Sequence, residues 1–163
     1  MLQSVIISLN TSQPIPLPKY SPKGMTEMKL TSFSIEWIDL RPHSLNAIDY
    51  IRVSFLRQYK TIIILRKNGR DEKISESKIR YDVSALLDRI SEIEEKSLWL
   101  SDYSVSKRCD HMWHMNLWRG RSRRRVSGNE NYPPNGEEIN RLLAETLKHA
   151  GVWKMPPLFG CGQ

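Results

Sequence analysis

One stretch of the chain determines much of the predicted fold: Trp113-His-Met-Asn-Leu-Trp-Arg-Gly-Arg-Ser-Arg-Arg-Arg-Val126. Its first half is typical of a β-strand, and five of its last nine residues are arginine. A two-residue turn at Gly120-Arg121 pairs Arg119 with Ser122, and therefore Met115 with Val126. The stretch therefore predicts a β-hairpin that carries an ordered group of positive charges.

This register assigns the side chains of the hairpin to two faces, because successive strand residues point to opposite sides of a sheet. Arg124 is assigned to the core side, opposite Leu117, whereas Arg119 and Arg121 belong to the turn. The core side is predicted to carry Trp113, Met115, Leu117 and Val126. The opposite side is predicted to carry His114, Asn116, Trp118, Arg123 and Arg125, with Trp118 facing Arg123 and Asn116 facing Arg125.

The first half of the chain resembles the second half at an offset of 52 residues. Asn68-Gly69 between strand-like segments predicts a second hairpin, in which a two-residue turn pairs Ile63 with Ile74. This pair and the pair Met115 and Val126 are related by the same offset. We therefore predict a ββα unit that is used twice, and chance similarity between two amphipathic segments is the alternative.

Each predicted hairpin is followed by an amphipathic helix. Asp82 is the expected N-cap of a helix that runs to about Glu95. The second helix is predicted from Gly136 to His149, with acidic residues in its first turn. The apolar stripes of the two helices are Val83, Leu86, Leu87, Ile90 and Ile93 in the first, and Ile139, Leu142, Leu143, Thr146 and Leu147 in the second.

The remaining segments complete a single predicted domain over residues 1–163. Alternation predicts strands at 29–38 and 50–55, and residues 2–9 are a further short strand candidate. Four prolines within residues 13–22 indicate an extended arm. The tail, 152–163, is largely apolar and is expected to pack on the sheet, with a docking peptide as the alternative. The predicted fold class is α+β: an antiparallel sheet with two main helices on one face.

Composition indicates a globular protein with a basic bias. The 163 residues include 25 lysines and arginines against 18 aspartates and glutamates, which gives a net charge of +7. Such a bias favours acidic partners, including phosphate backbones and acidic proteins. With two cysteines, no recognisable signal peptide and no long apolar run, a cytoplasmic location without membrane contact is expected.

The segment 99–147 resembles a small uncharacterised bacterial domain. The matching pattern comprises Trp99 to Tyr103, then Asp110-His-Met-Trp113, then Gly128-Asn-Glu-Asn-Tyr-Pro133. His111 stands where the pattern has glycine. The resemblance implies an order of strand, loop and helix, and it implies no catalytic residues. Independently, Gly128-Asn129 is expected to turn the chain with positive φ, and Trp113 and Tyr132 are expected to pack the hairpin against the helix.

The arginine hairpin is the feature that predicts a partner. Arginine beside an exposed tryptophan suits an acidic protein surface, because these are common hot-spot residue types. The same combination suits RNA or DNA, which is the alternative partner. A third interpretation is an edge hairpin whose charges prevent sheet-to-sheet pairing. The predicted binding residues are His114, Asn116, Trp118, Arg119, Arg121, Arg123 and Arg125.

Metal binding and catalysis have weaker support in the sequence. Cys109, His111 and His114 form a candidate metal site that Asp110 or Cys161 would complete, although strand alternation separates His114 from its neighbours. A ribonuclease would use His114 or His111 as a base with Arg123 on phosphate. Glu92, Glu94 and Glu95 are interpreted as a solvated helix face. No complete catalytic constellation is found and no cofactor is expected.

These observations lead to one functional prediction. The chain is expected to be a small, non-catalytic bacterial binding protein of the immunity or accessory type. It would contact an acidic protein surface, such as that of a toxin, through the arginine and tryptophan hairpin.

Overall fold

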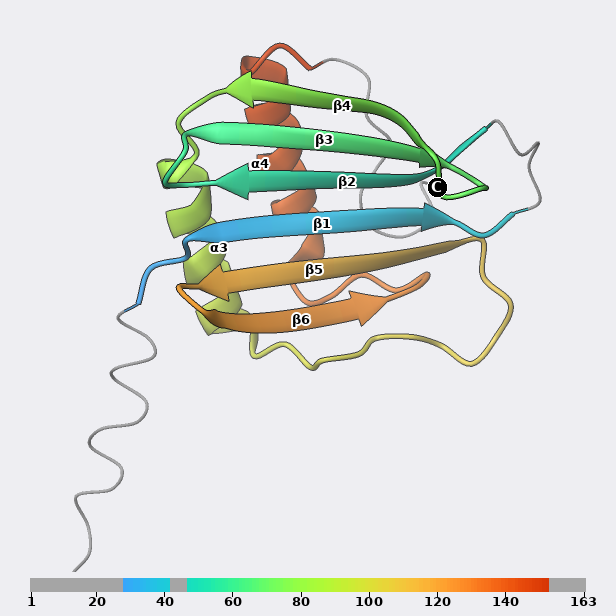
Figure 1. Cartoon of the computed structure of the whole chain (residues 1–163). Coiled ribbons are helices and arrows are strands. Elements are labelled where there is room, and N and C mark those ends of the chain that lie inside the picture. The colour runs from blue at the N-terminus through green and yellow to red at the C-terminus, as the bar shows by residue number, and fades with distance from the viewer. Residues whose placement is uncertain (1–27, 42–46, 153–163) are drawn as a thin grey trace, which may run out of the picture.

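The computed structural model describes residues 28–41 and 47–152, which form a six-stranded antiparallel sheet and two helices. The strand order across the sheet is β4-β3-β2-β1-β5-β6 (Figure 1). Along the chain, the elements are β1 (Ser32–Asp39), β2 (Ile48–Leu56), β3 (Thr61–Asn68), β4 (Lys73–Arg80), α3 (Ser84–Ser97), β5 (His111–Arg119), β6 (Ser122–Gly128) and α4 (Gly136–His149). The α+β class is confirmed.

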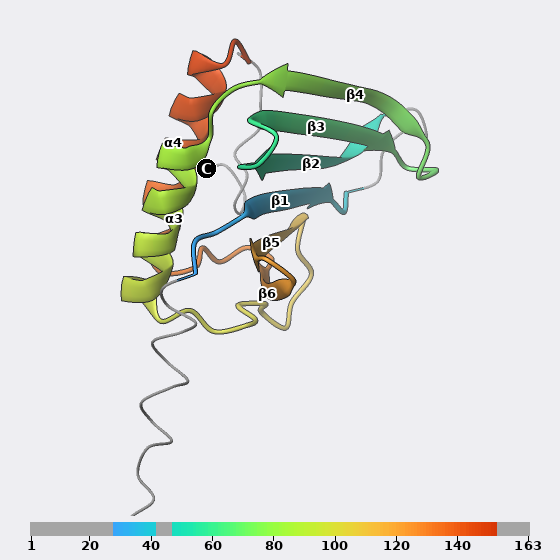
Figure 2. The same ribbon diagram turned by 60° about the vertical axis from the view of Figure 1, so that its left-hand side comes forward.

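Both helices cover the same face of the sheet, as Figures 1 and 2 show from two directions. The core lies between these two layers, where alternate strand residues meet the apolar stripes of the helices. The strands contribute Phe33, Ile35, Val53, Phe55, Ile62, Ile64, Trp113, Met115 and Val126, and the helices contribute Leu87, Ile90, Ile93, Ile139 and Leu143, all of them at most 1% exposed. The other face of the sheet is called the open face below.

Nonlocal pairing joins the two halves of the chain. β1 to β4 form consecutive antiparallel pairs, and α3 then carries the chain across the helix layer to β5. β5 pairs with β1, so that Ser34 lies beside Asn116 and Glu36 lies beside His114. The hairpin of β5 and β6 therefore forms one edge of the sheet, and the hairpin of β3 and β4 forms the other.

The register predicted for the second hairpin is confirmed, and the register predicted for the first is wrong. Met115 pairs with Val126, and Arg119 pairs with Ser122. Ile63, in contrast, pairs with Lys78 rather than with Ile74. The loop after β3 is longer than a two-residue turn because the Asn68 side chain accepts bonds from the backbone N–H groups of Arg70 and Glu72, both at 3.0 Å.

The predicted repeat holds for the helices and fails for the strands. The bounds of α3 and α4 are 52 residues apart at both ends, and each helix follows a hairpin. The offset of 52 residues aligns Ile63 with Met115 and therefore predicts that Ile63 faces the core. In β3, however, Ile62 and Ile64 face the core. The two ββα segments therefore share their order but not their strand pairing.

The two predicted helices are confirmed with one correction at an N-terminus. α4 has the predicted bounds, and the apolar stripes of both helices face the sheet. The N-cap of α3 is Val83 rather than Asp82, although the Asp82 carboxylate accepts a bond from the N–H of Ser84 at 3.0 Å. This bond lowers the pKa of Asp82. The predicted strand at 2–9 and the proline arm at 13–22 lie outside the described residues, as does the tail beyond Val152.

Candidate binding face

The open face brings the predicted hairpin side chains together in the predicted arrangement. Trp118 pairs with Arg123, and Asn116 pairs with Arg125, across β5 and β6. The guanidinium of Arg123 lies 5.6 Å from the centre of the Trp118 ring, which is a cation–π geometry. Arg123 and Arg125 are exposed, whereas Asn116 is only 7% exposed. The face therefore combines an arginine–tryptophan pair with a buried amide.

Strand order adds residues from the first half of the chain that the hairpin pattern did not predict. Glu36 of β1 lies between His114 of β5 and Arg52 of β2. The carboxylate of Glu36 accepts a bond from the Tyr50 hydroxyl at 3.1 Å and lies 3.9 Å from the guanidinium of Arg125. Burial and the charge of Glu36 raise the pKa of Tyr50 to about 12. Alternation in β1 and β2 placed Glu36 and Arg52 opposite the core residues, but it could not show which strands are neighbours.

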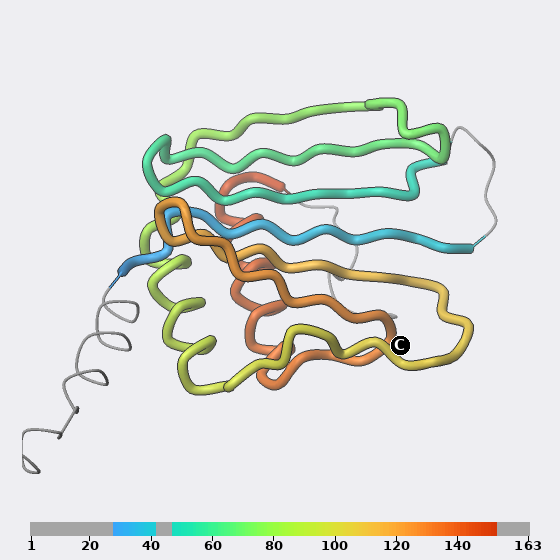
Figure 3. The backbone as a smooth tube through the Cα atoms, turned by 60° about the horizontal axis from the view of Figure 1, so that its bottom comes forward, coloured from blue at the N-terminus to red at the C-terminus, as the bar shows by residue number. Residues whose placement is uncertain are grey.

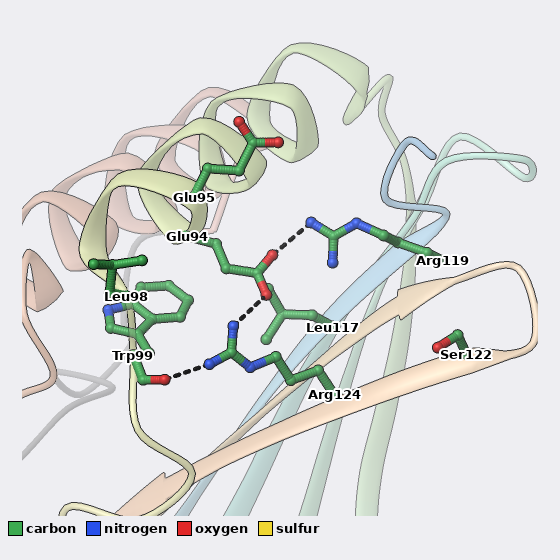
Figure 4. Close-up of a pocket in the computed structure, with 8 residues that line it drawn as sticks. All are labelled: Glu94, Glu95, Leu98, Trp99, Leu117, Arg119, Ser122 and Arg124. Atoms are coloured by element: carbon green, nitrogen blue, oxygen red, sulfur yellow. Dashed lines mark hydrogen bonds and ion pairs between the residues drawn. The ribbon is translucent and has the colours of Figure 1, made fainter. Parts of the chain in front are cut away.

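Two other hairpin arginines lie on the helix side of the sheet and bind Glu94 of α3 (Figure 4). Arg119 approaches one oxygen of the Glu94 carboxylate to 2.5 Å, and Arg124 approaches the other to 3.1 Å. Glu94 is 6% exposed, so the predicted solvated position of this residue is wrong. A carboxylate buried at this depth requires positive partners, and the hairpin supplies both.

Further hydrogen bonds fix these two guanidinium groups in place. Arg119 also donates to the carbonyl oxygen of Met28 at 3.1 Å and to the Ser91 hydroxyl at 3.1 Å. Arg124 also donates to the carbonyl oxygen of Trp99. A pocket of about 500 Å³ lies beside this cluster and is lined in part by Leu98 and Trp99. The cluster attaches α3 to the hairpin, so Arg119 lies away from the other predicted binding residues. Arg121 is exposed in the turn beyond the last strand pair, so it too is set apart from the arginines that line the open face.

Two polar atoms on the open face of β5 lack hydrogen-bond partners. Among the described residues, the buried side-chain nitrogen and oxygen atoms without a partner are Nδ1 of His114 and Oδ1 of Asn116. Burial, followed by the charge of Arg125, lowers the pKa of His114, whereas Glu36 and Asp102 act in the opposite direction. His114 is therefore predominantly neutral at neutral pH.

The candidate metal ligands do not converge. His111 faces the helix side, where its ring lies 5.2 Å from that of Trp37, and His114 points to the open face. The thiol of Cys109 donates to the carbonyl oxygen of Lys107 at 3.1 Å. Within residues 28–41 and 47–152, no group of three histidine, cysteine or acidic side chains is placed to hold a metal ion. The same separation prevents His111 from acting together with Arg123 in catalysis.

Several residues of the pattern in segment 99–147 contact one another or their neighbours beside β6. The segment that leads from α3 to β5 runs along this strand (Figure 3). There the N–H of Tyr103 donates to the carbonyl oxygen of Ser127 at 2.8 Å. The ring of Tyr103 stacks on that of Trp113, with centroids 6.4 Å apart. Asn129 exchanges two hydrogen bonds with the backbone of Val105, and the Trp99 indole donates to the carbonyl oxygen of Pro134 at 2.7 Å.

Two expectations for segment 99–147 are corrected. Gly128 does not have positive φ; a Cβ atom at this position would lie 2.4 Å from the indole of Trp113, so close packing explains the glycine. Trp113 is fully buried as expected, but Tyr132 is 36% exposed and is not part of the core.

Two comparisons with known sequences find no match. No protein-family model matches the chain. A search of curated proteins likewise finds no similar sequence. In the part of the chain that the structure describes, neither helix has the length and apolar character needed to cross a membrane.

Proposed function

We propose that this chain is a non-catalytic bacterial binding protein that contacts an acidic protein surface through its open face. The observation that carries this proposal is the gathering of Arg52, Arg123 and Arg125 with Trp118 on the side of the sheet away from both helices. Arginine and tryptophan are frequent hot-spot residues at protein interfaces. A rigid sheet also holds them in fixed relative positions, which reduces the ordering cost of association.

The charges of the open face favour a protein over a nucleic acid. Glu36 lies among the arginines, and its carboxylate would repel a phosphate backbone. One face of the Trp118 ring already carries the guanidinium of Arg123, which leaves less of the ring for a stacked base. A protein surface can place acidic groups against the arginines and a basic or neutral group against Glu36.

This mode of action supports our proposal of an immunity or accessory role. Such a protein acts by covering a surface of its partner, so it needs complementary charge and shape rather than a reactive centre. The described residues offer a stable two-layer fold with one polar, arginine-bearing face. The partner would be an acidic protein, such as a toxin.

The proposal is tested by crosslinking the full chain to its partner in the source cells and then measuring the affinity of the purified pair. Arg123→Gln is expected to weaken the complex by roughly tenfold, a typical hot-spot effect. Arg121→Gln, which removes the same charge from the same hairpin, is the matched control and should retain the affinity of the natural chain.

Nucleic acid is examined in parallel by fluorescence anisotropy with labelled RNA and DNA over a salt series. We expect no binding at moderate salt. Tight binding that falls steeply with salt and depends on Arg123 would contradict an acidic protein partner and would instead support nucleic-acid recognition.

A further inference from the structure

The open face contains a hollow lined by residues of β1, β2, β5 and β6, where three serines meet larger neighbours. Ser34 of β1 lies between Ser54 of β2 and Asn116 of β5, and Ser32 lies beside Trp118. The hollow encloses about 270 Å³. This volume lies below the roughly 300–1,000 Å³ of typical small-molecule sites. The hollow is therefore suited to a single side chain or functional group.

Asn116 lines the hollow and has one unused amide atom. Its Nδ2 lies 3.4 Å from the Ser34 hydroxyl, while its Oδ1 has no partner. Because a serine hydroxyl can donate or accept, a half-turn of the amide exchanges the two atoms and still leaves one unpartnered. Buried polar atoms without partners are uncommon in native proteins, and each needs a specific explanation such as a ligand.

The charges around the hollow select an anion. Three guanidinium groups, those of Arg52, Arg123 and Arg125, line it against one carboxylate, that of Glu36. The Glu36 carboxylate is already engaged by the Tyr50 hydroxyl and lies near Arg125. A carboxylate that entered beside Arg52 and Arg123 would gain charge-assisted hydrogen bonds.

We infer that this hollow receives one acidic side chain, an aspartate or a glutamate, from the partner protein. This inference rests on the proposed function and adds the chemical group that the open face recognises. The entering carboxylate accepts hydrogen bonds from the arginines and from the hydroxyls of Ser32 and Ser54. After the half-turn of its amide, Asn116 donates Nδ2 to the same carboxylate while its oxygen accepts from Ser34.

The effect of an Asn116 substitution on the stability of the protein distinguishes a ligand-binding asparagine from a structural one. If the unused atom of Asn116 serves a ligand, Asn116→Val removes an unsatisfied polar group from a strand and adds a β-branched side chain that strands favour. We therefore expect Asn116→Val to raise the Tm and to weaken carboxylate binding. A structural asparagine would instead give a lower Tm when it is replaced.

The experiment uses glutarate as the probe and the full chain labelled with ¹⁵N. Glutarate is added at constant ionic strength, and NMR follows the side-chain resonances of Asn116 Nδ2, Trp118 Nε1 and Arg123 Nε. We expect saturable shifts of all three resonances with glutarate, and no saturable shifts with chloride or with the neutral diamide of glutarate. Arg52→Gln and Arg123→Gln should each weaken binding by roughly tenfold, which is the usual loss for a hydrogen bond to a charged group.

The matched control is Arg121→Gln, which lowers the net charge equally but lies outside the hollow. It should leave glutarate binding unchanged. Shifts that do not saturate, shifts of equal size with the diamide, or an equal effect of Arg121→Gln would each overturn the inference, and so would a lower Tm for Asn116→Val.

Failure here is distinguishable from failure of the proposed function. If glutarate does not bind but the protein partner does and depends on Arg123, the hollow is not the acceptor site and the proposed function stands. If glutarate binds as expected but no partner depends on the open face, the carboxylate site stands and the proposed function fails.

Discussion

Two pairs of arginines in the same hairpin lie in contrasting environments. Arg119 and Arg124 point to the helix side, where both contact the buried carboxylate of Glu94. Arg123 and Arg125 point to the open face and are exposed. Neighbouring residues of identical chemistry therefore differ in the face of the sheet that they occupy. One pair attaches α3, and the other pair is exposed on the face that we propose binds a partner.

This comparison changes what the arginine-rich sequence means. A count of positive charges suggests one continuous basic patch, but the sheet separates the charges by face. The arginines that face α3 are compensated within the protein. The open face carries two of the five arginines in this run, Arg123 and Arg125, beside Trp118 and Arg52. Substitutions on the helix side should therefore change mainly the stability of the protein, and substitutions on the open face should change mainly partner binding.

The largest expected effect comes from Glu94→Ala. This substitution leaves the guanidinium groups of Arg119 and Arg124 near the core without their carboxylate. Breaking a buried charge cluster costs about 3–5 kcal/mol, and we expect about 3 kcal/mol here because Arg124 is 40% exposed. Chemical denaturation measures this loss as a lower free energy of unfolding.

Glu95→Ala is the matched control for this measurement. Glu95 lies next in α3 and is exposed, so its removal should change the free energy of unfolding by less than about 0.5 kcal/mol. Equal effects of the two substitutions would show that the cluster does not attach α3 to the hairpin.

An intermediate effect is expected from Arg119→Gln. This guanidinium joins Glu94, Ser91 and the backbone of Met28, and its side chain is 17% exposed. Its loss should lower the free energy of unfolding by about 2 kcal/mol, since hydrogen bonds to charged groups contribute roughly 1.5–3 kcal/mol. The affinity for the partner, measured on folded protein, should not change; a weakened complex would place Arg119 in the binding surface.

A small effect on stability is expected from Arg123→Ala. The cation–π contact with Trp118 at an exposed site contributes about 0.5–1 kcal/mol, which limits the change in the free energy of unfolding. The Tm measured by calorimetry should therefore fall only slightly. A loss as large as that of Glu94→Ala would show that the open face, like the helix side, is a structural surface.

The smallest effect concerns the pH dependence contributed by His114. Its pKa is lowered in the folded state, mainly by burial, so the unfolded chain takes up a proton more readily as the pH falls. The stability that neutral His114 contributes is therefore present above its unfolded pKa, near 6.5, and is lost as the pH falls toward the folded value. The free energy of unfolding of the natural chain, relative to that of His114→Gln, should be lower at pH 5 than at pH 7.5. A difference that is independent of pH would contradict this environment for His114.

Local sequence signals predicted the second half of the fold well. The turn at Gly120-Arg121 is short and its pairing follows from turn length alone, so the register of β5 and β6 was correct. The bounds of α4 followed from its apolar periodicity and from the acidic residues in its first turn. These features depend on residues close together in the chain.

The first hairpin was mispredicted because a side chain altered the turn. Asn68 accepts two backbone hydrogen bonds, and Asp71 adopts a positive φ of 60°, so the loop extends beyond Asn68-Gly69. The error then shifted the pairing along the whole of β3 and β4. The partner of Ile63 moves by four residues, from Ile74 to Lys78, and such a shift cannot be detected when both strands alternate weakly.

The remaining errors concern contacts between segments that are distant in sequence. Glu94 lies in an acidic part of α3 that suggests solvent, and only the packing of that helix on the hairpin brings Arg119 and Arg124 to it. Arg52 and Glu36 lie beside the hairpin arginines on the open face because β1 pairs with β2 and with β5, a choice that no local pattern specifies. Alternation could predict the face of the sheet that each of these side chains occupies, but it could not predict which strands lie beside them.

The most direct test compares Arg124→Gln with Arg125→Gln, two adjacent substitutions of the same chemistry on opposite faces. The measurement is the affinity of each folded variant for the purified partner protein at one ionic strength. We expect Arg125→Gln to weaken the complex by roughly tenfold and Arg124→Gln to leave it unchanged. Equal losses of affinity, or a loss confined to Arg124→Gln, would contradict the division of the hairpin into a structural and a binding face.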